Sequence, residues 1–227
     1  GVYGNFKAFS PDGEYLVTTY GGALLLYDGV TGEYLNEIPL GYTASHPDWS
    51  PDGEQLALVL TGSHSSDWTF TGGQIAVMDH LGDGSFTDPV VIHDPGDSYN
   101  AYYPTWSPDG EWIAFNISTE DAYDDVSAEL YAMTPDGSVV VELEGANMAE
   151  SLTNSWPKWA PLPDDDILWL AFASKRDYGT VTSSIPQIWV TGFDPAKAAL
   201  GVDPSWPAFW LPNQDAEENN HIPVWVE

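Results

Sequence analysis

Short runs of alternating hydrophobic and polar residues, separated by turn residues, occupy most of the chain. The clearest example spans residues 103–115, where Trp106 precedes the turn sequence Ser107-Pro108-Asp109-Gly110 and the apolar run Ile113-Ala114-Phe115 follows it. Proline fixes φ at the first central position of such a turn, Asp can bond its own backbone, and Gly takes the positive φ that closes a hairpin. The pattern therefore predicts two short antiparallel strands joined by a tight turn.

Similar stretches recur along the chain. Close copies lie at residues 9–13 and 49–53, and degenerate copies lie at residues 159–161 and 209–212, so that the turn prolines are 40, 57, 53 and 51 residues apart. Repeats of about 40 to 50 residues with four short strands each are typical of β-propeller blades. The sequence predicts an all-β fold, a β-propeller of four-stranded antiparallel blades with four full units and a partial fifth, at residues 6–40, 46–92, 103–143, 156–200 and 206–227.

The ends of the chain suggest that it is part of something longer. Gly1 stands in place of a starting Met, and the last unit has sequence for only two strands, the second at residues 222–226. A two-stranded blade leaves an open sheet edge, which proteins normally pair or cover. We therefore expect a single β-propeller domain over residues 1–227 that is a processed piece or fragment of a five- or six-bladed ring, completed by further residues or by a partner chain.

The repeated Trp-Ser-Pro-Asp-Gly, with its following apolar strand and a later strand such as Gln187-Ile188-Trp189, resembles the TolB-type, WD-repeat-like β-propeller family. The last third of the chain is similar to the C-terminal end of uncharacterised bacterial envelope or secreted members. The resemblance implies a location outside the cytoplasm, in the periplasm, on the outer surface or in the medium. Because members serve mainly as interaction platforms, it implies protein binding and supplies no chemistry.

The charge restricts the class of partner. The chain has 35 Asp and Glu residues against 5 Lys and Arg, a formal net charge of −30. Such a surface repels nucleic acid and anionic lipid, and it favours cations or a basic protein. There is no cysteine and no apolar run of the roughly 18 to 20 residues needed to span a bilayer.

The long loops of the predicted blades are the expected binding surface. Loops between the second and third strands, and connections between blades, lie on one face of a propeller, and the irregular segments 61–73, 93–103, 118–128 and 174–186 all fall in these positions. Aromatic residues would act as anchors and carboxylates would select a basic partner. The binding-face candidates are His64, Asp67, Trp68, Asp97, Tyr99, Tyr102, Tyr123, Lys175, Arg176 and Tyr178.

Two of these candidates have other readings. Lys175 and Arg176 are two of only five basic residues, and they could neutralise nearby carboxylates and so hold their loop against the neighbouring blade, or grip an anionic ligand. The loops as a whole could also be tolerated surface insertions with no partner.

Calcium is the one cofactor that the sequence suggests. Glu120, Asp121, Asp124 and Asp125 form one acidic loop and residues 164–166 form an acidic run, which offer the hard oxygen ligands that calcium takes. Neither has the spacing of a calcium-binding hand. None of the five histidines pairs at zinc spacing, and no catalytic serine elbow, phosphate-binding loop or dinucleotide fingerprint occurs.

These observations favour a non-catalytic, extracytoplasmic propeller that binds another protein through its long-loop face. One alternative is a structural subunit whose open blade is completed by a neighbouring chain. Another is a calcium-dependent hydrolase or the accessory propeller of an enzyme.

Overall fold

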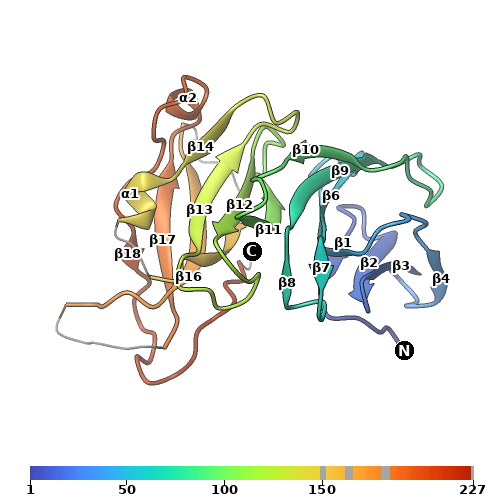
Figure 1. The fold of residues 1–227 in the computed structure, drawn as a ribbon, viewed down its shortest axis with the longest axis horizontal. Coiled ribbons are helices and arrows are strands. Elements are labelled where there is room, and N and C mark those ends of the chain that lie inside the picture. The colour runs from blue at the N-terminus through green and yellow to red at the C-terminus, as the bar shows by residue number, and fades with distance from the viewer. Residues whose placement is uncertain (149–151, 162–165, 180–184, 226–227) are drawn as a thin grey trace. The chain divides into compact units, whose positions relative to one another are not determined.

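The computed structural model describes residues 1–148, 152–161, 166–179 and 185–225 (Figure 1). Within these residues the fold is all-β, as predicted, apart from two single-turn helices, α1 (Glu144–Asn147) and α2 (Pro195–Ala198). Sixteen of the eighteen strands in the described residues form four four-stranded antiparallel sheets, and the other two form a small hairpin. These sheets are the blade-like units that the repeats predict.

The strand bounds follow the repeats closely. The first sheet contains, in order, β1 (Lys7–Phe9), β2 (Tyr15–Tyr20), β3 (Ala23–Asp28) and β4 (Tyr34–Glu37). The second contains β5 (Ala44–Trp49), β6 (Gln55–Leu60), β9 (Gln74–Asp79) and β10 (Val90–His93). The third contains β11 (Asn100–Trp106), β12 (Ile113–Ser118), β13 (Glu129–Met133) and β14 (Val140–Glu142). The fourth contains β15 (Ser155–Trp159), β16 (Leu168–Ser174), β17 (Gln187–Phe193) and β18 (Phe209–Trp210).

The Ser-Pro-Asp-Gly turns are held by a repeated set of hydrogen bonds. In the first, Ser10 Oγ donates to Asp12 Oδ1 at 2.5 Å and accepts the Tyr15 N–H at 2.9 Å, while Gly13 takes a φ of 74°. The turns at Ser50 and Ser107 repeat these bonds with distances within 0.1 Å. The Ser10 hydroxyl and the Glu14 N–H lower the pKa of Asp12. These turns carry the chemistry that the sequence predicts for them.

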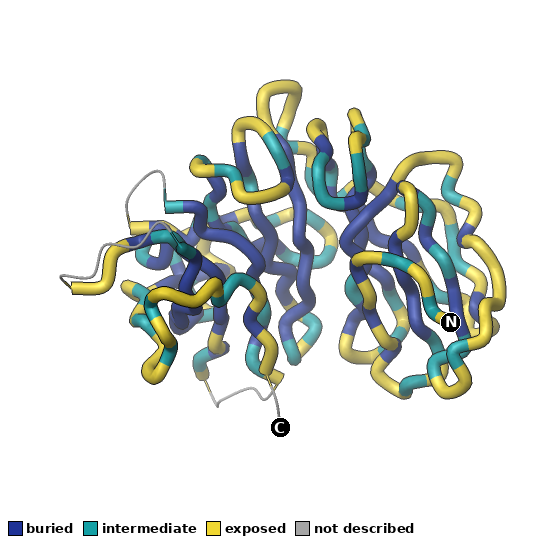
Figure 2. Tube along the Cα trace, turned by 90° about the horizontal axis from the view of Figure 1, so that it is seen from below, coloured by how far each residue is buried: buried dark blue, intermediate teal, exposed yellow. Residues whose placement is uncertain are grey.

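The chain forms two compact units, residues 1–106 with 120–123, and residues 107–119 with 124–227. The core of the first unit joins the first and second sheets through Val17, Leu26, Leu56, Leu58 and Met78, all nearly inaccessible to solvent. The core of the second unit is richer in aromatic residues, with Trp112, Trp159, Phe172, Trp189 and Phe193. In Figure 2 the buried positions follow the strands and the exposed positions follow the connections. Each fully buried Leu or Phe contributes about 1.5 to 3 kcal/mol.

The fourth sheet differs from the prediction. Phe209 and Trp210 were expected to open a fifth blade, but they pair with Val190 and Trp189 of β17 and complete the fourth sheet. The end of the expected fourth unit forms α2, where Asp194 accepts the N–H groups of Ala196 and Lys197 and Pro195 begins the helix. The outer strand therefore forms only after the chain has returned from α2.

The expected strand at residues 222–226 is also not found. Residues 211–225 contain no strand, and Val226 lies outside the described residues. Their polar groups are used locally: the Gln214 side chain accepts the Ile188 N–H and donates to the Ile188 carbonyl, 2.7 and 2.8 Å away. A side-chain amide thus substitutes for a strand beside the N-terminal end of β17. The contacts within the chain define two compact units. The expectation of a single β-propeller domain therefore stays a prediction.

Candidate interaction surface

The first strands of the second, third and fourth sheets share an unusual backbone conformation at an equivalent position. Three residues before each turn aromatic stand Phe6, His46, Tyr103 and Trp156, and the last three have φ values of 51°, 52° and 57° and each precede a proline. A left-handed conformation is uncommon outside glycine and is disfavoured before proline. The strand pairing shifts register at these points, between Ser45 and Asp48 and between Ser155 and Lys158. Such bulges redirect a side chain, and the local strain marks them as candidates for function.

In the first unit the redirected side chains form a continuous aromatic cluster. His46 packs 4.1 Å from both the Phe6 and the Tyr103 ring, measured between centroids. Phe6 lies 4.6 Å from Trp68, and Trp68 lies 5.8 Å edge-to-face from Tyr123. Tyr102 contacts Tyr103 at 5.0 Å and is fully buried. We call Phe6, His46, Trp68, Tyr102, Tyr103 and Tyr123 the aromatic cluster.

The cluster combines predicted and unpredicted residues. Trp68, Tyr102 and Tyr123 come from three of the predicted long loops, and they meet in the cluster. Phe6, His46 and Tyr103 were not predicted as site residues, although their shared repeat position was a signal that could have found them. The cluster runs from the buried Tyr102 to Tyr123, whose side chain is 41% exposed, so one end can be reached by a partner.

Asp67 is an internal residue of the first unit. Its loop, residues 61–73, contains a small hairpin of β7 (Ser63–His64) and β8 (Phe70–Thr71) that directs the carboxylate inward. One oxygen accepts the Gly22 N–H at 2.8 Å, and the other accepts the Asn5 side-chain amide at 2.8 Å and the Gly21 N–H at 3.1 Å. His64 Nε2 lies 3.3 Å from the carboxylate. Asp67 therefore joins the long loop of the second sheet to the first sheet, and it is only 4% exposed.

Asp97 and Tyr99 lie on the connection between β10 and β11 and are exposed. Within the described residues neither makes an ion pair or a ring contact with the aromatic cluster. They remain surface groups on a predicted binding segment.

Arg176 lies between the second and third strands of the fourth sheet, as Asp67 does in the second sheet, and it is also buried. Its guanidinium donates to Ser174 Oγ at 2.9 Å, to the Ala146 carbonyl of α1 at 2.7 Å and to Asn154 Oδ1 at 2.6 Å. The same group lies about 5 Å from the rings of Phe172 and Trp189. Burial lowers the pKa of Arg176 to about 10. Among the described residues none of these partners is a carboxylate, so Arg176 fixes its loop without neutralising an acidic side chain, contrary to the expectation from the sequence.

The neighbouring residues Lys175 and Tyr178 are more accessible. Lys175 Nζ lies 2.6 Å from Asp124 Oδ1 in a half-exposed ion pair. Tyr178 stacks on Trp210 with 4.5 Å between ring centroids and is 50% exposed. The structure thus separates Lys175 and Tyr178, which can meet a partner, from Arg176, which is buried.

The predicted calcium ligands are engaged with the protein. Asp121 Oδ1 accepts the Ala122 N–H, Asp125 Oδ1 accepts both the N–H and the hydroxyl of Ser127, and Asp124 pairs with Lys175. Glu120 is exposed. Across the described residues no three His, Asp or Glu side chains come together as metal ligands. Asp164 and Asp165 of the second acidic run lie outside these residues, so calcium binding stays a prediction.

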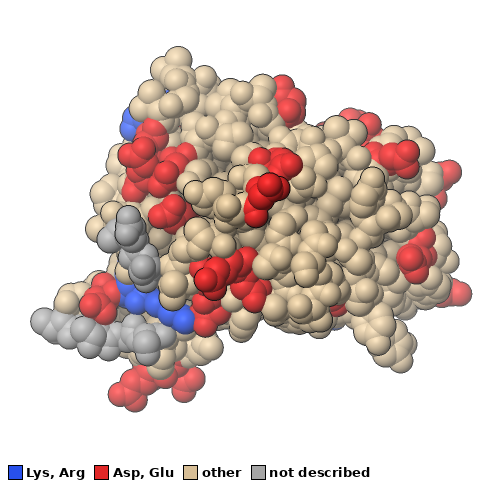
Figure 3. All heavy atoms as spheres, in the orientation of Figure 1, with Lys and Arg blue, Asp and Glu red and all other residues tan. Residues whose placement is uncertain are grey.

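Acidic residues far outnumber basic residues in the part of the chain that forms the aromatic cluster. Residues 1–106 contain 14 acidic residues and a single basic one, Lys7. Red acidic groups are scattered over the visible surface in Figure 3, where blue basic groups are few. None of the described helices is long and apolar enough to cross a membrane.

The chain resembles solved structures at low identity. Hydrazine synthase from Kuenenia stuttgartiensis matches with 18% identity and a TM-score of 0.52, covering 94% of this chain and 55% of that one. An oligogalacturonate lyase in complex with manganese matches with 20% identity and a TM-score of 0.50, covering 85% of this chain and 50% of that one. This chain therefore spans about half the length of these two proteins. At such identities the likeness is one of fold.

Two TolB structures are also similar to the chain. A protein assigned as TolB from Agrobacterium tumefaciens has 20% identity and a TM-score of 0.38, covering 83% of this chain and 76% of its own. TolB from Acinetobacter baumannii has 15% identity and a TM-score of 0.42, covering 91% of this chain and 56% of its own. No protein-family model and no curated protein matches the sequence.

Proposed function

We propose that this chain is a non-catalytic protein-binding module, and that its partner is a basic protein held at the outer end of the aromatic cluster. The observation that carries the proposal is the cluster itself. The partly exposed ring of Tyr123 packs on Trp68, and Trp68 packs on Phe6. Phe6 in turn contacts His46, one of the residues with a strained backbone.

Rigid aromatic anchors suit protein recognition. A tyrosine whose ring is fixed by its neighbours loses little conformational freedom on binding, and buried aromatic anchors supply most of the free energy of many interfaces. The acidic surroundings would attract a basic partner and accelerate its association. The resemblance to envelope and secreted propellers supports a location outside the cytoplasm, which cell fractionation of the native protein would test.

The test begins with recovery of the partner by cross-linking to the native protein in its own cells. The affinity of the recovered protein is then measured for the wild type and for Tyr123→Ala, which removes a partly exposed ring, and circular dichroism verifies that the variant folds. We expect affinity to fall at least tenfold, about 1.4 kcal/mol, and to decline with added salt.

Phe9→Ala is the matched control, because Phe9 is 58% exposed and lies outside the aromatic cluster. Its affinity should equal that of the wild type. An affinity that is unchanged by Tyr123→Ala, or a partner that carries a net negative charge, would overturn the proposal.

A further inference from the structure

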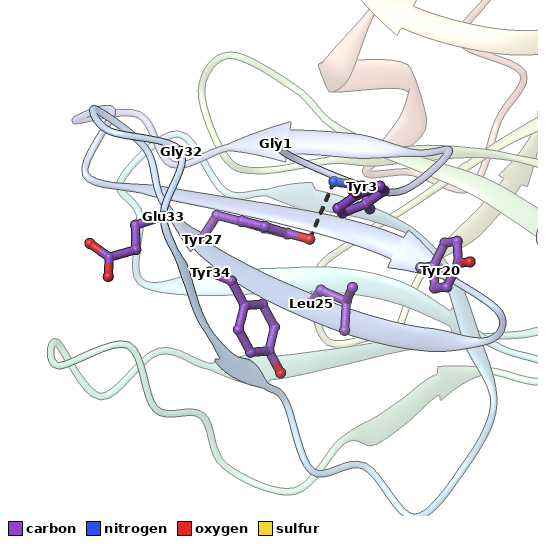
Figure 4. A pocket seen from close by; sticks show the side chains of 8 residues that line it. All are labelled: Gly1, Tyr3, Tyr20, Leu25, Tyr27, Gly32, Glu33 and Tyr34. Atoms are coloured by element: carbon purple, nitrogen blue, oxygen red, sulfur yellow. Dashed lines mark hydrogen bonds between the residues drawn. The ribbon is translucent and has the colours of Figure 1, made fainter.

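A tyrosine-lined hollow lies on the first sheet, apart from the aromatic cluster. It has a volume of about 640 Å³ and is lined by Tyr3, Tyr20, Leu25, Tyr27, Glu33 and Tyr34, together with the backbone at Gly1 and Gly32. Figure 4 shows Tyr20 at one end, Glu33 at the other, and the rings of Tyr3, Tyr27 and Tyr34 between them. The Tyr3 N–H donates to the Tyr27 hydroxyl at 3.3 Å, which ties the N-terminal segment to the floor of the hollow.

The register of the strands identifies which face of the sheet this is. Leu16 pairs with Tyr27 in the first sheet as Leu56 pairs with Met78 in the second, and Thr18 pairs with Leu25 as Leu58 pairs with Ala76. In the second sheet this face packs into the core against the first sheet. The hollow therefore occupies the face of the first sheet that corresponds to a packing face.

The chemistry of the two equivalent faces differs. On the equivalent face of the second sheet, Leu60, Ala76 and Met78 are apolar and at most 7% exposed. The first presents tyrosines, of which Tyr20 and Tyr34 are 60% and 52% exposed. Within the described residues the hydroxyls of these two tyrosines make no hydrogen bond. A dry sheet packed on this face would bury both hydroxyls without partners, which is costly. A hydrated interface with a polar backbone suits them better.

The charge around the hollow selects for a cation. Glu33 lines the hollow, and Glu37 lies on the same face because it pairs with Leu25. Lys7, the only Lys or Arg in residues 1–106, also lies on this face through its pairing with Thr18, so the carboxylates outnumber it. A second copy of this chain, with a net charge of −30, would be repelled. An arginine side chain would find the carboxylate of Glu33 and the faces of several tyrosine rings together.

We propose that this hollow binds an extended peptide segment rich in proline and arginine. Proline rings pack on exposed aromatic faces, and a polyproline II segment is already extended, so it loses little conformational entropy on binding. The free hydroxyls of Tyr20 and Tyr34 would donate to its backbone carbonyls, and Glu33 would pair with its arginine. The site is separate from the surface of the proposed function and does not depend on it.

Fluorescence anisotropy with a labelled peptide of repeated Pro-Pro-Arg tests the site on the 227-residue chain. We expect saturable binding, at least tenfold weaker for the double variant Tyr20→Ala with Tyr34→Ala. Both rings are largely exposed, so the variant should fold, and circular dichroism would verify it. Glu33→Gln should weaken binding several-fold and reduce its dependence on salt.

Two controls make the result decisive. A Pro-Pro-Glu repeat should not bind, and the double variant Phe9→Ala with Tyr42→Ala, which removes two exposed rings outside the hollow, should bind like the wild type. Absence of Pro-Pro-Arg binding, or equal loss in the control variant, would overturn the inference. So would a wild-type dimer in light scattering that Tyr20→Ala with Tyr34→Ala converts to monomer, since a sheet of a second copy would then cover the hollow. Because Tyr123 is unchanged throughout, these outcomes leave the proposed function untouched.

Discussion

Asp67 in the first unit and Arg176 in the second are buried charges of opposite sign in equivalent loops. Asp67 lies between the second and third strands of its sheet, and Arg176 lies between the second and third strands of the fourth sheet. Each is at most 6% exposed. Asp67 makes three hydrogen bonds to other segments, and Arg176 makes two, to Ala146 and Asn154, besides one to the nearby Ser174. Both were candidates for an exposed binding face, and both instead fix a long loop from inside.

The two residues fix their loops through different contacts. The carboxylate of Asp67 accepts backbone N–H groups of the Gly21-Gly22 turn, whereas the guanidinium of Arg176 donates to a carbonyl, an amide and a hydroxyl and lies against two aromatic rings. No carboxylate pairs with Arg176 among the described residues. A buried charged residue in a long loop can thus fix the position of the loop, while its exposed neighbours are the residues that a partner can reach.

The largest effect is expected at Arg176. Arg176→Ala should lower the free energy of unfolding by about 3 to 5 kcal/mol, because it empties a buried site and leaves the Ala146 carbonyl and the Asn154 side chain without their donor. Arg176→Lys, which keeps the charge but loses the planar fork, should cost about half as much. Urea unfolding of the three proteins measures this. If Arg176→Ala costs less than about 1 kcal/mol, Arg176 does not support its loop.

A somewhat smaller effect is expected at Asp67. Asp67→Ala should cost about 2 to 3 kcal/mol, because the N–H groups of Gly21 and Gly22 lose a buried acceptor. The matched variant Asp97→Ala changes an exposed carboxylate and should stay within about 0.5 kcal/mol of the wild type. Hydrogen exchange should also increase at Gly21 and Gly22 in Asp67→Ala alone. Equal stability of the two variants would contradict an internal role for Asp67.

Each unit also contains a histidine whose pKa burial lowers, His93 in the first and His221 in the second. For His93 nearby Asp94 opposes this shift; for His221 Asp124 opposes it and Lys175 adds to it. As pH falls through about 6.5, the unfolded chain gains a proton that the folded chain resists, so stability is present above this pH and declines below it.

We expect each histidine to contribute less than about 1 kcal/mol of this decline between about pH 7 and pH 5, since both are partly exposed. His93→Gln and His221→Gln should each flatten the unfolding free energy over this window. A pH profile identical to that of the wild type in both variants would refute the prediction.

The smallest effect is expected for the ion pair of Lys175 and Asp124. A double-mutant cycle with Lys175→Ala and Asp124→Ala should give a coupling free energy of about 0.2 to 1 kcal/mol, reduced in high salt, because both groups are substantially exposed. A coupling as large as the cost of Arg176→Ala would mean that the exposed cation, and not the buried one, holds this loop.

The sequence by itself determined the local architecture of this protein. Each Ser-Pro-Asp-Gly turn closes through bonds among residues at most five positions apart, and the alternating apolar residues on either side pair as expected. Turn chemistry and strand periodicity act over short distances along the chain, so they can be read from the residues directly. The strong negative charge is likewise a property of composition.

Tertiary structure alone decided which loop residues face solvent and which strands complete a sheet. Asp67 and Asp97 look alike in the sequence, but only Asp67 meets backbone N–H groups 45 and 46 residues away. Phe209 resembles the start of a new blade, yet it pairs with β17 and belongs to the fourth strand of that sheet. The aromatic cluster assembles from positions as far apart as Phe6 and Tyr103. In each case the deciding contact joins distant parts of the chain, which no local pattern specifies.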